Sequence, residues 1–144
     1  MSNTAIKIRT VAYREATAEI HFVRQRVFQE EQGVSAELEF DGLDEGATHL
    51  LAYSQEQAVG TTRMRMLDNA TAKIERVAVL TSQRGKGVGR QLMNYAVDYL
   101  RGQGVGRIKV NAQLPVKAFY EGLGFVAQGE VFEEAGIPHV TMWL

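Results

Sequence analysis

In the middle of the chain lies the stretch Arg84-Gly85-Lys86-Gly87-Val88-Gly89-Arg90, which is rich in glycine and in basic residues. It separates a strand-like segment, residues 73–80, from apolar residues at helical spacing. A helix N-terminus offers unpaired N–H groups and the positive end of the helix dipole. Glycines let an anion approach the backbone, and basic side chains add charge. The stretch therefore predicts an anion-binding loop.

The segments on both sides of this loop predict a β–loop–α–β unit. Five apolar residues share one face of the helix after the loop: Leu92, Met93, Ala96, Val97 and Leu100. The helix is expected to end at Gly102 or Gly104, and residues 107–111 follow as a short strand. A right-handed crossover would then place strands 73–80 and 107–111 side by side and parallel.

The rest of the chain predicts further strands and helices around this unit. The expected strands are residues 6–9, 48–53, 58–66, 125–128 and 139–144, with helices over residues 15–31 and from 115 to about 122, and a loop or broken helix over 34–46. Strands 48–53, 58–66 and 73–80 have the short polar turns of an antiparallel meander. We therefore expect one α+β domain, residues 1–144, built on a mixed sheet.

Composition excludes several classes of protein. The chain is 45% apolar and 23% charged, so it is neither disordered nor of low complexity. It has no cysteine, and its three histidines are scattered, so neither a disulfide framework nor a metal site is expected. The start, MSNTAIKIRT, lacks the apolar core of a signal peptide, and no apolar run approaches the ~20 residues that span a bilayer. We expect a cytoplasmic protein with no membrane contact.

Two familiar phosphate loops do not match the central stretch. The P-loop pattern G-x-x-x-x-G-K-[ST] is absent, and a dinucleotide fingerprint would need glycine where Arg90 stands. The second glycine cluster, residues 102–106, follows a helix and is interpreted as a helix stop. Nucleic acid is not expected either, because the net charge is −1 and no aromatic residues alternate with the bases.

The motifs resemble those of the GNAT N-acetyltransferases. Residues 84–89 look like the R/Q-x-x-G-x-G/A acyl-CoA signature of that family, and residues 119–125 look like its F-Y-x-x-L-G-F helix. Residues 76–79 resemble the strand that pairs with the pantetheine arm. The segments 27–33 and 136–140 resemble a small bacterial branch, the YjcF-like acetyltransferases, which is often grouped with glucosamine-phosphate acetyltransferases.

The resemblance implies a fold and a cofactor. The fold would be a mixed, mostly antiparallel sheet with a splayed central parallel strand pair and helices on both faces. The co-substrate would be acetyl-CoA, without a metal. Members of the family often form dimers, and the apolar terminal segment, residues 140–144, would be an exposed sheet edge. We therefore expect a symmetric homodimer through this end.

The resemblance also implies which residues contact acetyl-CoA and act on it. The contact residues would be Val77, Ala78, Val79, Arg84, Gly85, Lys86, Gly87, Val88, Gly89, Arg90, Asn111, Phe119 and Tyr120. Backbone N–H groups near Val77 and Val79 would polarise the thioester carbonyl. Tyr120 is the candidate general acid, because a phenol with a pKa of about 10 carries a proton at neutral pH.

The general base has several candidates. Glu75 precedes the thioester-binding strand and could act through water, and His139 is suited by residue type. His21, in a predicted helix, and His49, at a strand start, are weaker candidates. Bulk water is a further possibility, since a primary amine has a pKa of about 10.4 and must lose a proton before it can attack.

The acceptor is predicted from charge. Seven acids and no base lie between positions 30 and 45: Glu30, Glu31, Glu37, Glu39, Asp41, Asp44 and Glu45. A field of that sign favours a small cationic amine. The alternative is an amino-sugar phosphate, for which Arg63, Arg65 and Lys73 could supply the bases. A non-catalytic acyl-CoA-binding module is a third possibility, against which the presence of Tyr120 argues.

Overall fold

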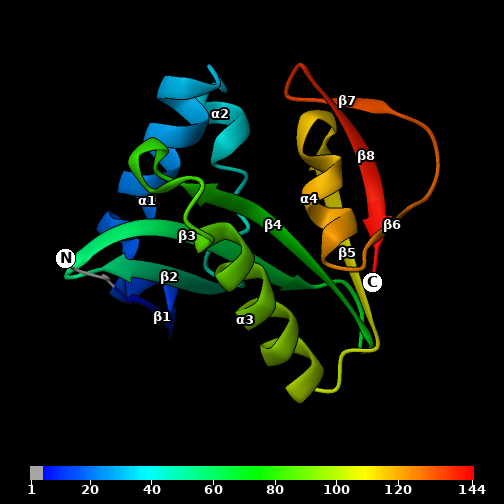
Figure 1. Ribbon diagram of the computed structural model, residues 1–144, viewed down its shortest axis with the longest axis horizontal. Coiled ribbons are helices and arrows are strands. Elements are labelled where there is room, and N and C mark those ends of the chain that lie inside the picture. Colours follow the sequence, from blue (N-terminus) through cyan, green and yellow to red (C-terminus); the bar gives the residue numbers. More distant parts are fainter. Residues whose placement is uncertain (1–4) are drawn as a thin grey trace.

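The computed structural model describes residues 5–144, which form one eight-stranded sheet with helices on both faces (Figure 1). The strands are β1 (Ile6–Val11), β2 (Thr48–Ser54), β3 (Gln57–Met66), β4 (Thr71–Val79), β5 (Arg107–Gln113), β6 (Val126–Ala127), β7 (Phe132–Glu134) and β8 (Ile137–Trp143). The α-helices are α1 (Thr17–Arg24), α2 (Ala36–Glu39), α3 (Val88–Gly102) and α4 (Lys117–Gly122). Short helical turns are η1 (Tyr13–Glu15), η3 (Thr81–Gln83) and η4 (Leu114–Val116), and η2 (Gln25–Glu31) continues α1 as a π-helix.

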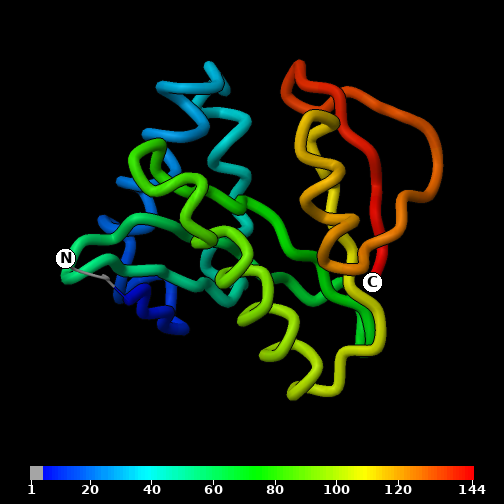
Figure 2. The backbone as a smooth tube through the Cα atoms, in the orientation of Figure 1, coloured from blue at the N-terminus to red at the C-terminus, as the bar shows by residue number. Residues whose placement is uncertain are grey.

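The sheet confirms the predicted α+β class and the splayed parallel pair. Its order is β1-β2-β3-β4-β5-β8-β6, with β7 also paired to β8, and only β4 and β5 are parallel neighbours. Their pairing joins residues 71–73 to residues 107–109 and no others in the described chain. Beyond these residues the two strands diverge. Figure 2 shows the resulting division between the part of the chain up to β4 and the orange-to-red C-terminal part.

Alternation along the strands divides the core between the two faces of the sheet. Leu50 of β2 packs with the apolar face of α3, and its neighbour Leu51 packs with Ile20 and Val23 of α1. This follows from the period of two in a strand, which points successive side chains to opposite faces. The amphipathic helix predicted after the glycine loop is therefore confirmed, with Leu92 and Ala96 fully buried.

The prediction of an open terminal edge was wrong. β8 lies inside the sheet, with β5 on one side and β6 and β7 on the other. The sequence analysis missed β7, a strand of three residues whose Phe132 is only half-buried, so its apolar pattern is too short to identify. The homodimer remains an expectation, but the exposed edge at residues 140–144 that suggested it is not present in the sheet. Within residues 5–144 no helix is long and apolar enough to cross a membrane.

Candidate active site

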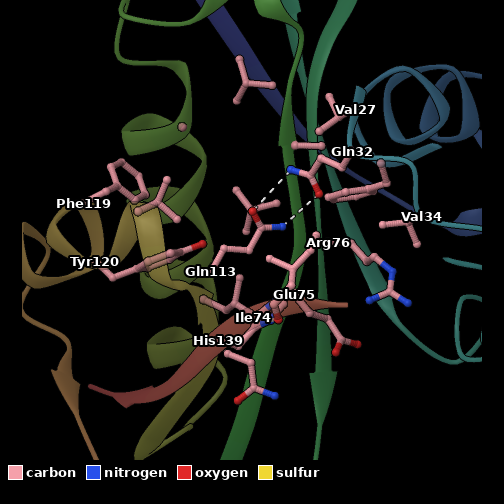
Figure 3. Close-up of a pocket in the computed structure, with 18 of the residues that line it drawn as sticks. Val27, Gln32, Val34, Ile74, Glu75, Arg76, Gln113, Phe119, Tyr120 and His139 are labelled. Carbon is pink, nitrogen blue, oxygen red and sulfur yellow. Dashed lines mark hydrogen bonds between the residues drawn. The ribbon is translucent and has the colours of Figure 1, made fainter. Parts of the chain in front are cut away.

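A cavity of about 970 Å³ opens where β4 and β5 diverge (Figure 3). Its walls come from η2, α2, the end of β3, β4, the glycine loop, the start of α3, β5, α4, the turn between β7 and β8, and the start of β8. It is lined by every predicted acetyl-CoA contact except Lys86, and by the candidate catalytic residues Glu75, Tyr120 and His139. The splay of the sheet therefore brings together residues from both halves of the chain.

The glycine loop forms the N-terminal end of α3. Gly85 and Gly87 have φ angles of +76° and +82°, which side chains with a Cβ rarely adopt. Gly87 is the N-cap, and the first bond of the helix runs from the Gln91 N–H to the Gly87 carbonyl oxygen. The N–H groups before Gln91 thus have no helical partner, and no side chain caps the helix. An anion could accept hydrogen bonds from them.

The basic residues of the loop differ in their surroundings. Arg84 donates to both carboxylate oxygens of Glu31 on η2, at 2.5 and 2.6 Å, and to the carbonyl oxygen of Val79 at 2.9 Å. These bonds hold the pKa of Glu31 below its usual value. Lys86 and Arg90 are exposed and form no ion pair within residues 5–144. Their positive charges are therefore available to an anion at the glycine loop, where Arg90 lines the cavity.

The end of β4 presents backbone N–H groups to the cavity side. The Leu80 N–H donates to the Val59 carbonyl oxygen of β3. Successive N–H groups of a strand point in opposite directions, so the N–H of Val79 points away from β3, toward the gap. The register of β3 with β4 shifts near Arg76, which has a φ of +54°. This bulge turns the strand end away from β5.

Tyr120 reaches the cavity from α4, in the opposite wall (Figure 3). Its ring packs edge-on against Phe119 and Phe125, at centroid distances of 5.1 and 5.8 Å. Only 8% of the residue is exposed, and this burial raises the pKa of Tyr120 to about 12. Its hydroxyl is therefore protonated at neutral pH. Phe119 also contacts the glycine loop, lying 3.5 Å from the position that a Cβ on Gly89 would occupy.

Glu75 lines the cavity but is surrounded by cations. Arg63 donates to its carboxylate at 2.8 Å, Lys73 lies 3.2 Å away, and Arg65 forms a third ion pair. Although burial alone would raise the pKa of Glu75, these cations hold it at about 2. A carboxylate with so low a proton affinity is a weak base. The geometry therefore disfavours Glu75 among the candidate bases.

His139 lines the cavity, and one of its ring nitrogens forms no hydrogen bond within residues 5–144. Its Nδ1 lies 2.6 Å from the carbonyl oxygen of Ile137, which can only accept, so Nδ1 carries the proton. Nε2 of the neutral ring is then an acceptor, 3.9 Å from a Glu134 carboxylate oxygen. Phe132 stacks on the ring at 5.9 Å and fixes its plane. Nearby, the Asn111 side chain accepts from Thr141 at 3.0 Å and contacts Glu134.

The other two histidines lie away from the cavity. His49 is buried beneath α2 with Nε2 2.9 Å from the Asp44 carbonyl oxygen, and desolvation lowers its pKa. The Nε2 of His21 lies 2.5 Å from the Tyr13 hydroxyl. Neither residue lines the cavity, so the structure does not bring them to the site.

The acidic segment is not an open field of negative charge, and this corrects the reason for expecting a cationic acceptor. Glu39 and Asp44 are buried and paired with Arg24, and Asp41 forms two hydrogen bonds of 2.7 and 2.8 Å to Arg63. Glu31 is paired with Arg84 as described. Of the remaining acids, Glu37 and Glu45 are exposed and form no ion pair within residues 5–144, and Glu30 contacts only the exposed Arg26.

Sequence reasoning missed a bridge across the cavity. Gln32, just after η2, and Gln113, at the end of β5, exchange two side-chain hydrogen bonds of 3.0 and 3.4 Å (Figure 3). The two residues are 81 positions apart, and amides at that separation give no signal in a single sequence. The bridge, here called the glutamine bridge, links the two diverging halves at the open end.

Known proteins match the chain over nearly its whole length. The family model described as an acetyltransferase (GNAT) domain matches residues 11–144. The chain belongs to this family. It is 37% identical to the uncharacterised N-acetyltransferase YjcF of Bacillus subtilis, over 89% of the chain and 91% of the relative. GNAT membership makes the chain an acyltransferase and the cavity its candidate active site.

Solved structures agree with this assignment. A candidate N-acetyltransferase from Lactobacillus plantarum superposes with a TM-score of 0.90 at 30% identity, covering 96% of this chain and 97% of the other. An acyl-CoA N-acyltransferase from Pseudomonas aeruginosa gives 0.85 at 29% identity, covering 96% and 99%. The GNAT-type sheet that the sequence predicts is thus confirmed.

Proposed function

We propose that the protein transfers an acetyl group from acetyl-CoA to a primary amine of a small molecule, within a complex of both substrates. One observation carries the proposal: the unpaired N–H groups before Gln91 lie at the same cavity that the Tyr120 and His139 side chains line. An anion-binding helix end and two proton-transfer groups thus meet in one chamber. The name of the Pseudomonas relative, an acyl-CoA N-acyltransferase, supports the same donor class.

The glycine loop would hold the pyrophosphate of acetyl-CoA. Its N–H groups and the exposed Lys86 and Arg90 supply donors and positive charge. The pantetheine arm of the cofactor would then lie in the gap between β4 and β5. There it would form hydrogen bonds with the backbone groups of β4 that β5 leaves unpaired. The N–H of Val79, or that of Val77 two residues earlier on the same side of β4, would donate to the thioester carbonyl and stabilise the oxyanion of the tetrahedral intermediate.

Proton transfers complete the reaction. His139 Nε2 would take a proton from the acceptor ammonium and release it to water, leaving a neutral amine that attacks the thioester carbon. When the C–S bond breaks, the sulfur would receive the Tyr120 hydroxyl proton, and the second amine proton would return to Tyr120. With its pKa raised to about 12, Tyr120 keeps its proton until the thiolate forms beside it.

A thiol-release assay tests the proposal. Acetyl-CoA is mixed with a panel of primary amines, and free CoA thiol is followed together with the acetylated product by mass spectrometry. Amine-dependent thiol release with a matching acetamide product is the expected result. If acetyl-CoA binds and no amine is acetylated, the alternative of a non-catalytic acyl-CoA-binding module is the better account.

A further inference from the structure

Beneath α2, nine charged side chains form one connected network. The cations are Arg24, Arg63, Arg65, Lys73 and Arg76, and the carboxylates are Glu39, Asp41, Asp44 and Glu75. The network therefore carries one positive charge in excess. A buried charge without a partner is costly, so where this excess lies decides what the network can do.

Three of the cations are held by several carboxylates. Arg24 is 1% exposed and binds both Glu39 and Asp44. Arg63 is fully buried and binds Asp41, Asp44 and Glu75, which raises its pKa. Arg76 lies 3.2 Å from Asp41 and also donates to the carbonyl oxygens of α2. Arg24 thus fastens α2 to α1, whereas Arg63 and Arg76 fasten α2 and the loop after it to the sheet, and each of the three shares its charge among at least two carboxylates.

Arg65 and Lys73 are different. Their side chains face each other across β3 and β4, and both share the single carboxylate of Glu75. They are 22% and 16% exposed, and both line the cavity. Arg65 uses Nε and Nη2 toward Glu75, and Nη1 has no partner within residues 5–144. The excess positive charge of the network therefore lies on these two side chains, at the cavity wall.

We propose that Arg65 and Lys73 bind an anionic group, a phosphate or a carboxylate, on the acceptor amine. The proposal rests on the proposed function and names its acceptor class. It excludes Arg63, which the sequence analysis grouped with these two, because three carboxylates already surround Arg63. A guanidinium and an ammonium side by side supply the donors and charge that such anions accept.

The register of the sheet gives the length of this acceptor. Lys73 is level with Lys109 of β5, and His139 is level with Gln113 of the same strand. Four residues of β-strand span about 13 Å, so the anion subsite and the amine-activating nitrogen lie well apart even after the reach of Lys73 is subtracted. The acceptor thus carries its amine several bonds from its anionic group, as an amino-sugar phosphate or an ω-amino acid does.

Matched acceptor pairs test this proposal. One pair is glucosamine 6-phosphate against glucosamine, and the other is 6-aminohexanoate against 6-aminohexanamide, so that phosphate and carboxylate are distinguished. For at least one pair, kcat/KM is expected to be about ten- to a hundredfold higher for the anionic member, since hydrogen bonds between charged groups are strong. Arg65→Gln and Lys73→Gln should each bring the ratio of the two kcat/KM values in a pair down toward one, because the cation that distinguishes the anionic member is removed.

Two further variants separate contact from folding and from general charge. Arg65→Lys keeps the cation and should retain most of the preference if Arg65→Gln abolishes it. Lys109→Gln removes the neighbouring charge, which lies over Trp143 and does not line the cavity, and should leave the preference intact. Equal use of both members of both pairs, or a preference that survives both Gln variants, overturns the subsite while the proposed function stands.

The proposed function and the proposed anion subsite can be tested independently of each other. If no amine in the panel is acetylated, the proposed function fails, and the subsite is tested by calorimetry with glucosamine 6-phosphate and 6-aminohexanoate in the presence of CoA. Binding of either that Arg65→Gln abolishes supports the subsite, and no binding of either overturns it.

Discussion

The two ends of the cavity present different kinds of chemical group to a ligand. At the end of the glycine loop, the groups that face the cavity are mostly backbone: the N–H groups before Gln91 and those at the end of β4. At the α2 end they are side chains held by buried ion pairs, such as Glu75 with Arg63 and Lys73. A backbone site depends on local geometry, whereas an ion-pair site depends on long-range packing. The two ends should therefore respond differently to substitution.

The largest expected effect is at the loop. Gly87→Asp places a side chain at a φ of +82° and a carboxylate where the pyrophosphate would lie. We expect the affinity for acetyl-CoA to fall at least a hundredfold, measured by calorimetry. Gly104→Asp is the matched control, since its φ is +86° with equally open space in the α3–β5 turn. Equal losses in both variants would mean strain rather than anion binding.

Loss of the Tyr120 hydroxyl comes next. Tyr120→Phe keeps the ring contacts with Phe119 and Phe125 and removes only the proton donor. We expect kcat to fall by about 10²–10⁴ and the dissociation constant of acetyl-CoA to stay within twofold. Tyr99→Phe on α3 serves as the control. A kcat that is unchanged when chemistry is rate-limiting would leave Tyr120 with a packing role.

The base is tested by the pH profile. His139→Gln should lower kcat/KM by about 10², because deprotonation of the acceptor ammonium is then left to water. The variant should recover part of its rate at high pH, where more of the amine is neutral. An unaltered profile would show that water, and not His139, accepts the proton.

Glu75 should matter for stability in acid. Its folded pKa of about 2 lies below the unfolded value of about 4.3, so its contribution is present above pH 4.3 and is lost as the pH falls toward 2. We expect Glu75→Gln to be destabilised by of order 3 kcal/mol at pH 7, and by less at pH 3, because its cations lose their partner. Denaturant unfolding at both pH values, with the exposed Glu56→Gln as control, measures this. A constant difference would contradict it.

The smallest effect is expected at the exposed acids. Glu30 and Glu37 carry no buried ion pair, and Glu30 contacts Arg26 only at 3.8 Å on the surface. The double variant Glu30→Gln/Glu37→Gln should change acceptor kcat/KM by less than about twofold, at low and at high salt. A larger loss that salt abolishes would restore the case for a cationic acceptor.

The same contrast explains what the sequence could predict. The glycine loop, the strand before it and the helix after it are continuous in the chain, so residues 73–111 could be interpreted from local patterns alone. The F-Y-x-x-L-G-F helix likewise placed Tyr120, whose buried position and cavity contact the structure supplies. Backbone sites leave such local signatures because glycines and helix starts are needed at fixed spacings.

The acidic segment shows why the rest could not be predicted. Seven acids within sixteen residues look like one charged surface in the sequence. Several of them are paired in the structure, and their partners Arg24, Arg63 and Arg84 lie outside the segment. Pairing between distant residues is decided by tertiary packing, which a single sequence does not display. The internal position of β8 was hidden as well, because β7 is too short to give a periodic pattern and the pairing of the predicted strand over residues 125–128 with β8 is a tertiary contact.

The short pairing of β4 with β5 has a mechanical consequence. β4 and β5 are joined at residues 71–73 and 107–109, and the glutamine bridge links the two halves of the chain again near the mouth of the cavity. Because the two strands pair at one end only, a small change in the angle between them gives the largest displacement at their unpaired ends. A wider mouth would therefore stretch the glutamine bridge and leave the β4–β5 ladder intact. In the proposed complex, the pantetheine arm of acetyl-CoA would lie between β4 and β5 and fix their separation.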